Sequence, residues 1–327
     1  MSIETPAIQN EQGQVIPESM AEIISVNIGG IQQYLMIRGE HRDSPILLCI
    51  HGGPGQSEIG YIRPYQEALE KRFLVVRWDQ RGAGLSASPN LPQESFSLSH
   101  FVSDTLQVTD YLIQRFNQPK IFITGHSWGS ILATHAVQNS PEKYIAYIGV
   151  GQFVDAQKSE VIAYQHSIAE AKIQNNSDIL EQLEAIGQPP YDAPAFLVRA
   201  KCLSQLGGVF KTAPSIDMGQ AFMTSTEYSP SVKSDYMPNA MASSEVLAPE
   251  ILQVRFLEDI HSFDLPVYFI MGKHDYHTPT AMVEQFYHQI TAPRKELILF
   301  ENSAHMPQLE EHHAFNQTLI RILDECC

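Results

Sequence analysis

The sequence predicts an α/β protein built on a mostly parallel central sheet with helices on both faces. Three observations support this fold class. Short runs rich in β-branched residues alternate with amphipathic stretches through residues 22–151. The runs end at Gly, Asp or His, and the same alternation resumes near residue 263. Buried parallel strands read as continuous short apolar runs, and strand–helix–strand order implies parallel crossovers, so a sheet covered on both faces is expected.

The first half of the chain supplies most of the expected elements. Residues 23–28 and 34–37, on either side of Gly29-Gly30, predict a leading hairpin. Later apolar runs predict buried strands at 46–50, 73–76, 121–124 and 144–150. The amphipathic stretches between them predict helices at 65–71, 101–116 and 130–138.

The middle of the chain has a different sequence pattern. Residues 153–262 lack strand-like runs and contain helix-like segments such as 160–173 and 178–186. Loops rich in Pro, Ser and Met separate these segments. We therefore expect a mostly helical insertion at 153–262.

The strand pattern then returns and completes the sheet. Apolar runs at 267–271 and 297–300 predict two more strands, and a closing helix is expected from about 312 to 323. The organisation that follows is one sheet domain made of residues 1–152 and 263–327, with the insertion between them.

Composition excludes several functional classes. The 327 residues carry 21 Lys+Arg against 37 Asp+Glu, a formal net charge of −16. An acidic chain without a basic cluster repels nucleic-acid phosphates and anionic membrane surfaces. No apolar stretch reaches the ~20 residues of a spanning helix, the first twenty residues lack a secretory pattern, and the four cysteines have no disulfide or metal-ligand spacing. We expect a cytoplasmic protein acting on a small-molecule substrate, with no nucleic-acid or membrane partner; the oligomeric state is left open.

The sharpest motif is Gly125-His126-Ser127-Trp128-Gly129, which lies between an expected strand and an expected helix. The pattern G-x-S-x-G in this context is typical of a nucleophile elbow, a tight turn that exposes a serine hydroxyl. The following helix also points its N-terminal N–H groups at the site, which favours a developing oxyanion. Ser127 is therefore the candidate nucleophile.

A serine nucleophile needs a histidine base held by an acid, and both should follow downstream in loops after strands. Asp275 follows the strand expected at 267–271, and His305 follows the last expected strand. Asp155, shortly after the strand at 144–150, is a second candidate for the acid. His274 and His277 flank Asp275, but no matching third ligand cluster accompanies them, so no metal is expected.

Two glycine-rich loops complete the pattern. The oxyanion needs two N–H donors, for which Trp128 and Gly53, within the HGGPG loop at 51–55, are the candidates. The loop at 79–86 has glycines but fits no phosphate-binding fingerprint. It is expected to be structural, braced by an ion pair of Asp79 or Arg81.

Together these motifs resemble the α/β-hydrolase superfamily, and in detail its proline-iminopeptidase-like branch, which macrolide esterases also resemble. The resemblance covers both sheet segments and implies a Ser127–His305–Asp275 triad with a helical cap at 153–262. It rests on HGGPG at 51–55, DQRGAGLS at 79–86, GHSWGS at 125–130, GKHD at 272–275 and SAH at 303–305.

The resemblance is weaker in the expected cap. Proline iminopeptidases bind a free amine with cap glutamates set in aromatic motifs, and those motifs are missing here. Glu227 and Glu245 stand at plausible positions for an amine site. Phe222 and Met223 belong to a group of apolar cap residues, some of which are expected to line an adaptable pocket.

Three functional hypotheses follow. The first is a serine hydrolase that forms an acyl-enzyme from the carboxylic ester or lactone of a bulky neutral or cationic small molecule, with macrolide-type lactones among the candidates. The second is an aminopeptidase that releases an N-terminal residue, like the proline iminopeptidases. The third is a non-catalytic ligand-binding relative. No cofactor is implied, and the net charge of −7 within residues 153–262 favours a neutral or cationic substrate.

Overall fold

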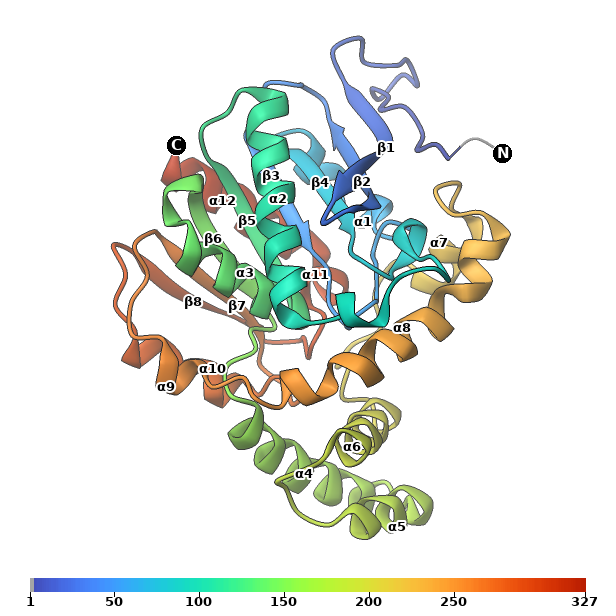
Figure 1. Cartoon of the computed structure of the whole chain (residues 1–327), viewed down its shortest axis with the longest axis vertical. Helices are drawn as coiled ribbons and strands as arrows, with labels where there is room; N and C mark the ends of the chain where they lie inside the picture. The colour runs from blue at the N-terminus through green and yellow to red at the C-terminus, as the bar shows by residue number, and fades with distance from the viewer. Residues whose placement is uncertain (1–2) are drawn as a thin grey trace.

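An eight-stranded sheet runs through the molecule in the computed structural model, which describes residues 3–327 (Figure 1). The spatial order of the strands is β1-β2-β4-β3-β5-β6-β7-β8. The β1–β2 and β2–β4 pairs are antiparallel, and all other neighbours are parallel. This architecture confirms the predicted α/β fold class. The strands are β1 (Met20–Ile28), β2 (Ile31–Gly39), β3 (Ile46–Ile50), β4 (Leu74–Asp79), β5 (Ile121–His126), β6 (Tyr144–Val150), β7 (Val267–Gly272) and β8 (Lys295–Phe300).

Helices cover both faces of the sheet. The helices α2 (Leu98–Phe116), α3 (Trp128–Asn139) and α10 (Thr280–Gln289) pack on one face. The helices α1 (Arg63–Glu70) and α12 (His312–Cys326) pack on the other. Two short helices, α9 (Phe256–Asp259) and α11 (Pro307–Glu310), complete the core.

Strand β3 shows why the apolar residues of such a segment are consecutive in the sequence and do not alternate with polar ones. Ile46, Leu48 and Ile50 join the apolar cluster of α2 and α3, whereas Leu47 and Cys49 join the cluster of α12. Successive side chains point to opposite faces, and both faces are buried, so every position is apolar.

Of the helices between β6 and β7, the five that precede α9 stand at the edge of the sheet where the parallel strands end (Figure 1). Each begins at a residue whose side chain accepts a hydrogen bond from the backbone N–H three residues later, which satisfies a free donor of the first turn. The helices are α4 (Ala156–Ile173), α5 (Ser177–Ile186), α6 (Ala193–Gln205), α7 (Met218–Thr224) and α8 (Pro230–Ile251), and the capping residues are Asp155, Asn176, Asp192, Asp217 and Ser229.

The two ends of this helical segment leave the core side by side. Asp155 and Arg255 form an isolated antiparallel bridge, with Ala156 N–H bonded to Val254 O at 3.1 Å and Phe256 N–H bonded to Val154 O at 2.8 Å. The helices α4 to α6 also bury a small apolar cluster of their own, which includes Leu183.

A membrane-spanning helix is not found within residues 3–327, because no helix there is both long and apolar enough.

Candidate active site

Ser127 lies in the tight turn between β5 and α3, with φ 54° and ψ −120°. The two flanking glycines allow this turn. A Cβ atom at Gly125 would lie 2.3 Å from Gly129 O, and one at Gly129 would lie 2.2 Å from Ile50 O. Both neighbours are backbone atoms that cannot move aside, so only glycine fits. The Ser127 backbone N–H bonds to Val150 O at 2.9 Å, which fastens the turn to β6.

Asp275 and His305 face each other across two loops that follow β7 and β8. His305 Nδ1 and Asp275 Oδ2 are 2.8 Å apart. The other carboxylate oxygen accepts backbone hydrogen bonds from His277 at 2.8 Å and from Thr278 at 3.0 Å. Burial alone would raise the pKa of Asp275, but the facing His305 and the hydrogen bonds outweigh burial and lower it. The aspartate is therefore held as an anion beside the imidazole.

The histidine loop is also fastened next to the serine. His126, the residue before Ser127, lies with its ring 4.8 Å from that of His305, and its Nε2 is 2.9 Å from His305 O. Gly151 allows the imidazole to approach, because a Cβ there would lie 3.1 Å from His305 Cε1. The structure thus pairs the predicted base with the predicted acid and brings His305 next to His126, the chain neighbour of Ser127.

The second candidate for the acid, Asp155, lies elsewhere. Its carboxylate caps α4 by accepting from Lys158 N at 2.9 Å, and Lys158 Nζ is 3.5 Å away. Among residues 3–327, the carboxylate that pairs with His305 is that of Asp275. No three His, Cys, Asp or Glu side chains of that described range converge as a metal-binding group.

Glu310 braces the loop that carries His305, a role with no local sequence signal. Its carboxylate accepts backbone hydrogen bonds from Ala304 at 2.7 Å, Lys211 at 2.6 Å and Thr212 at 2.9 Å. It therefore joins the loop after β8 to the segment that connects α6 and α7.

The two candidate oxyanion donors are Trp128, which follows Ser127 in the chain, and Gly53, which lies in the loop after β3. Trp128 is the first residue of α3, and its indole N–H donates to Gln80 Oε1 at 3.0 Å. Gln80 also donates to His51 O at 2.9 Å, at the start of the loop that contains Gly53. Gly53 has φ +114°, a conformation that favours glycine.

That loop approaches the nucleophile closely. A Cβ atom at Gly52 would lie 3.2 Å from Ser127 Cβ and 2.9 Å from His126 Nδ1. Burial lowers the pKa of His51 to about 4, so this imidazole stays neutral and serves as a structural part of the loop.

The loop at 79–86 is braced in two ways. Arg81 forms the ion pair, with Asp104 of α2 at 3.0 Å. Asp79 instead accepts hydrogen bonds from the hydroxyls of Ser57 and Tyr228 and, at 2.6 Å, from Leu85 N. Burial raises the pKa of Asp79 to about 7.

Within residues 3–327, no hydrogen bond, ion pair or ring contact joins the four candidate binding residues between β6 and β7 to Ser127, Asp275 or His305. Glu227 is buried and accepts from Arg63 Nε at 3.0 Å and from Thr5 Oγ1 at 3.0 Å. Glu245 is exposed on α8. Phe222 packs edge-on against tyrosine rings, and Met223 is 69% exposed.

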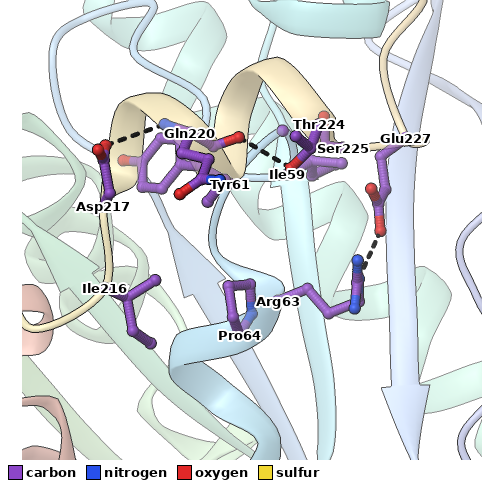
Figure 2. A pocket seen from close by; sticks show the side chains of 12 residues that line it. Ile59, Tyr61, Arg63, Pro64, Ile216, Asp217, Gln220, Thr224, Ser225 and Glu227 are labelled. Carbon is purple, nitrogen blue, oxygen red and sulfur yellow. Dashed lines mark hydrogen bonds and ion pairs between the residues drawn. The ribbon is translucent and has the colours of Figure 1, made fainter.

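Glu227 and Arg63 instead line a separate hollow of about 280 Å³ (Figure 2). Its walls are the segment 59–64 and helix α7. Ser127, Asp275 and His305 are not among its lining residues.

Four buried glutamates are each paired with an arginine. They are 1–5% exposed, so an unpaired charge there would be costly. The pairs are Glu58 with Arg77, Glu70 with Arg38, Glu160 with Arg199, and Glu227 with Arg63.

Comparison with known proteins identifies a shared family. A family model described as serine aminopeptidase, S33, matches residues 43–312. A curated relative, a probable aminopeptidase YbaC of Bacillus subtilis, is 38% identical over 313 residues, covering 94% of this chain and 98% of the relative. A proline iminopeptidase of Clostridium botulinum is 24% identical over 296 residues, covering 85% of this chain and 89% of that protein.

Solved structures agree at the level of the fold. A proline iminopeptidase of Mycobacterium smegmatis superposes with a TM-score of 0.64 at 16% identity, covering 93% of this chain and 98% of its own. A bacterial membrane phospholipase A superposes with a TM-score of 0.65 at 18% identity, covering 95% of this chain and 87% of its own.

Proposed function

Since this chain belongs to the serine aminopeptidase S33 family of α/β-hydrolases, we propose that it is a carboxylic-ester or lactone hydrolase that uses Ser127, His305 and Asp275. Its substrate is a bulky neutral or cationic small molecule, held under the helices of residues 153–262 acting as a cap. Macrolide-type lactones have this character, because they join a large neutral ring to amino sugars. The net charge of −7 on the proposed cap suits a cationic substituent.

The proposed reaction runs through an acyl-enzyme. His305 takes the proton of Ser127 as the hydroxyl oxygen attacks the ester carbonyl. The N–H groups of Gly53 and Trp128 bind the oxyanion, an interaction for which each donor is typically worth about 10²- to 10³-fold in rate. His305 then gives its proton to the leaving alcohol, and water releases the acid by the same steps in reverse order.

Asp275 orients the base in this mechanism. Its carboxylate accepts the Nδ1–H of His305 at 2.8 Å, which leaves Nε2 bare to receive the serine proton. The low pKa of Asp275 keeps it charged as the imidazole becomes positive.

One observation favours an ester over a peptide N-terminus. An aminopeptidase must bind an ammonium group with a carboxylate that has no other cation. The buried glutamates Glu58, Glu70, Glu160 and Glu227 each hold an arginine already, Glu310 is occupied by three backbone N–H groups, and Glu245 is exposed on α8. A neutral acyl group therefore fits these surroundings better than a free amine.

Aminopeptidase activity is the second candidate. It is favoured by the relative at 38% identity, which is named a probable aminopeptidase. Amide and ester cleavage share the acyl-enzyme, so the two proposals differ in recognition and not in the reacting groups.

The test compares p-nitrophenyl esters, macrocyclic lactones and prolyl arylamides in the wild type and in Ser127→Ala. We expect ester turnover that Ser127→Ala lowers by about 10³-fold or more. Unchanged turnover in that variant would exclude the mechanism. Efficient arylamide cleavage that collapses in Glu227→Ala or Glu245→Ala would instead establish the aminopeptidase.

A further inference from the structure

Arg199 of α6 is buried with part of its guanidinium unused. Its side chain is 2% exposed. Nε donates to Glu160 Oε2 at 2.6 Å, and Nη2 donates to Glu160 Oε1. Within residues 3–327, Nη1 has no hydrogen-bond partner although it is closed off from solvent. Such a buried N–H of a charged group calls for an acceptor.

His277 has an unused ring nitrogen in the same region. Its Nε2 is also buried without a partner in the described chain. Burial, together with the nearby charges of His305 and Arg199, lowers the pKa of His277 well below its usual value. The imidazole is therefore neutral and offers a single donor or acceptor at Nε2.

Both groups lie beside the proposed base. The ring of His277 stacks on that of His305 with centroids 5.1 Å apart. A second stack, between the rings of His166 and Tyr276, has its centroids 3.5 Å apart and holds the loop of Asp275 against α4. Arg199 is close enough to His277 for its charge to affect the imidazole. One unused polar atom thus belongs to the acid loop itself, next to α4, and the other to Arg199 of α6, whose charge acts on that loop.

We propose that Arg199 and His277 form a subsite that binds a neutral oxygen of the substrate, either a hydroxyl or a carbonyl, in the part that leaves as the alcohol. This inference rests on the proposed function. His305 protonates the leaving oxygen, so the leaving group passes its imidazole, and the ring of His277 lies next to it.

The chemistry of the pair selects a neutral oxygen. Glu160 already supplies the negative charge that Arg199 requires, so a substrate carboxylate would bring a second anion to one guanidinium. A hydroxyl accepts from Arg199 Nη1 and donates to a bare His277 Nε2. A carbonyl accepts from both nitrogens when Nε2 carries the proton.

The test uses hexyl butanoate and its analogues with one hydroxyl or keto oxygen on carbon 3, 4 or 5 of the alcohol. All share one acyl group, and the released butanoic acid is titrated. We expect kcat/KM of at least one oxygenated ester to exceed that of hexyl butanoate by tenfold or more, since such sites discriminate strongly against partners that leave them unpaired. The hydroxyl and keto series separate the two kinds of oxygen.

Two independent variants test whether His277 and Arg199 cause the preference for oxygenated esters. His277→Phe keeps the stacked ring and removes the nitrogen. The double variant Glu160→Met/Arg199→Met removes the ion pair together, so that no charge is buried alone. In each variant, kcat/KM of the oxygenated esters should fall to within about threefold of kcat/KM of hexyl butanoate. His166→Phe, a matched change in the other stack, should keep the wild-type ratio.

The outcomes separate this subsite from the proposed function. If no ester is cleaved in a Ser127-dependent way, the proposed function fails and the subsite fails with it. If hexyl butanoate is cleaved through Ser127 but every ratio is close to unity, or the ratio persists in His277→Phe and in the double variant, only the subsite is overturned. In the second case the unused nitrogens hold water.

Discussion

Tyr228 donates its hydroxyl hydrogen to the buried carboxylate of Asp79, with O···O distances of 2.8 and 2.9 Å to the two carboxylate oxygens. Tyr228 precedes α8, and Asp79 ends β4, so this contact joins the helices between β6 and β7 to the sheet. A Cβ at Gly84 would lie 2.3 Å from the same hydroxyl, so the glycine leaves room for the contact.

We predict that Asp79 makes the protein less stable as the pH rises. Burial raises its pKa to about 7, whereas the unfolded chain ionises near 3.8. Between these values the folded state holds a proton that the unfolded state has lost, so stability falls as pH rises through this window. Asp79→Asn should remove this dependence, which is of the order of a few kcal/mol. Unfolding curves of the two proteins that stay parallel from pH 4 to pH 8 would contradict the assignment.

Asp275→Asn should lower kcat by about 10³-fold or more and change KM little, because the amide no longer holds the base in the required tautomer. Steady-state kinetics with a p-nitrophenyl ester measures kcat and KM separately. Asp155→Asn serves as the control, since Asp155 caps α4 and pairs with Lys158. A larger loss of kcat in Asp155→Asn than in Asp275→Asn would identify Asp155 as the acid of the triad.

Gly52→Ala should reduce activity far more than stability. The new methyl group would lie 3.2 Å from Ser127 Cβ and 2.9 Å from His126 Nδ1. The proposed mechanism brings the substrate carbonyl to this side of Ser127, so the methyl group would obstruct it. A loss of about 10²-fold in kcat/KM is expected. Gly219→Ala, on the exposed surface of α7, is the matched control, and thermal unfolding of both variants reports stability. Equal activity of the two variants would place the reacting carbonyl away from Gly52.

Glu310→Gln should lower kcat by about 10- to 100-fold through misplacement of His305. The amide keeps one acceptor oxygen but turns an NH₂ group toward backbone donors that the carboxylate now accepts. We expect KM to change less than kcat, and Glu310→Asp to recover part of the loss. Glu301→Gln, which breaks an exposed pair with Lys273, should leave both constants unchanged. A kcat for Glu310→Gln equal to that of Glu301→Gln would show that the brace does not position the base.

The sheet and the glycine turns were predictable because their signals are local. Strand β3 is buried on both faces and reads as five consecutive apolar residues, and the glycines around Ser127 are required by backbone atoms within a few ångströms. Helix α8 was harder to recognise, since it contains Pro238 and Pro249, which usually mark helix ends.

The partners of the glutamates could not be predicted in this way. Glu227 pairs with Arg63, 164 positions earlier, and no pattern near either residue indicates the other. Glu227 and Glu245 looked alike in sequence, yet one is buried in an ion pair and the other is exposed. Ion pairing over such separations depends on the folded arrangement of whole elements.

The bridge between Asp155 and Arg255 makes the helices between them a closed loop on the sheet. Because both ends of the loop are held at one place, helices can be lengthened, lost or exchanged there without shifting the register of β6 against β7. Two contacts limit such changes, because Tyr228 ties the segment to Asp79 of the sheet and Glu310 ties it to the loop of His305. A change of length elsewhere in the segment is therefore expected to leave the sheet unaltered as long as these two contacts are kept.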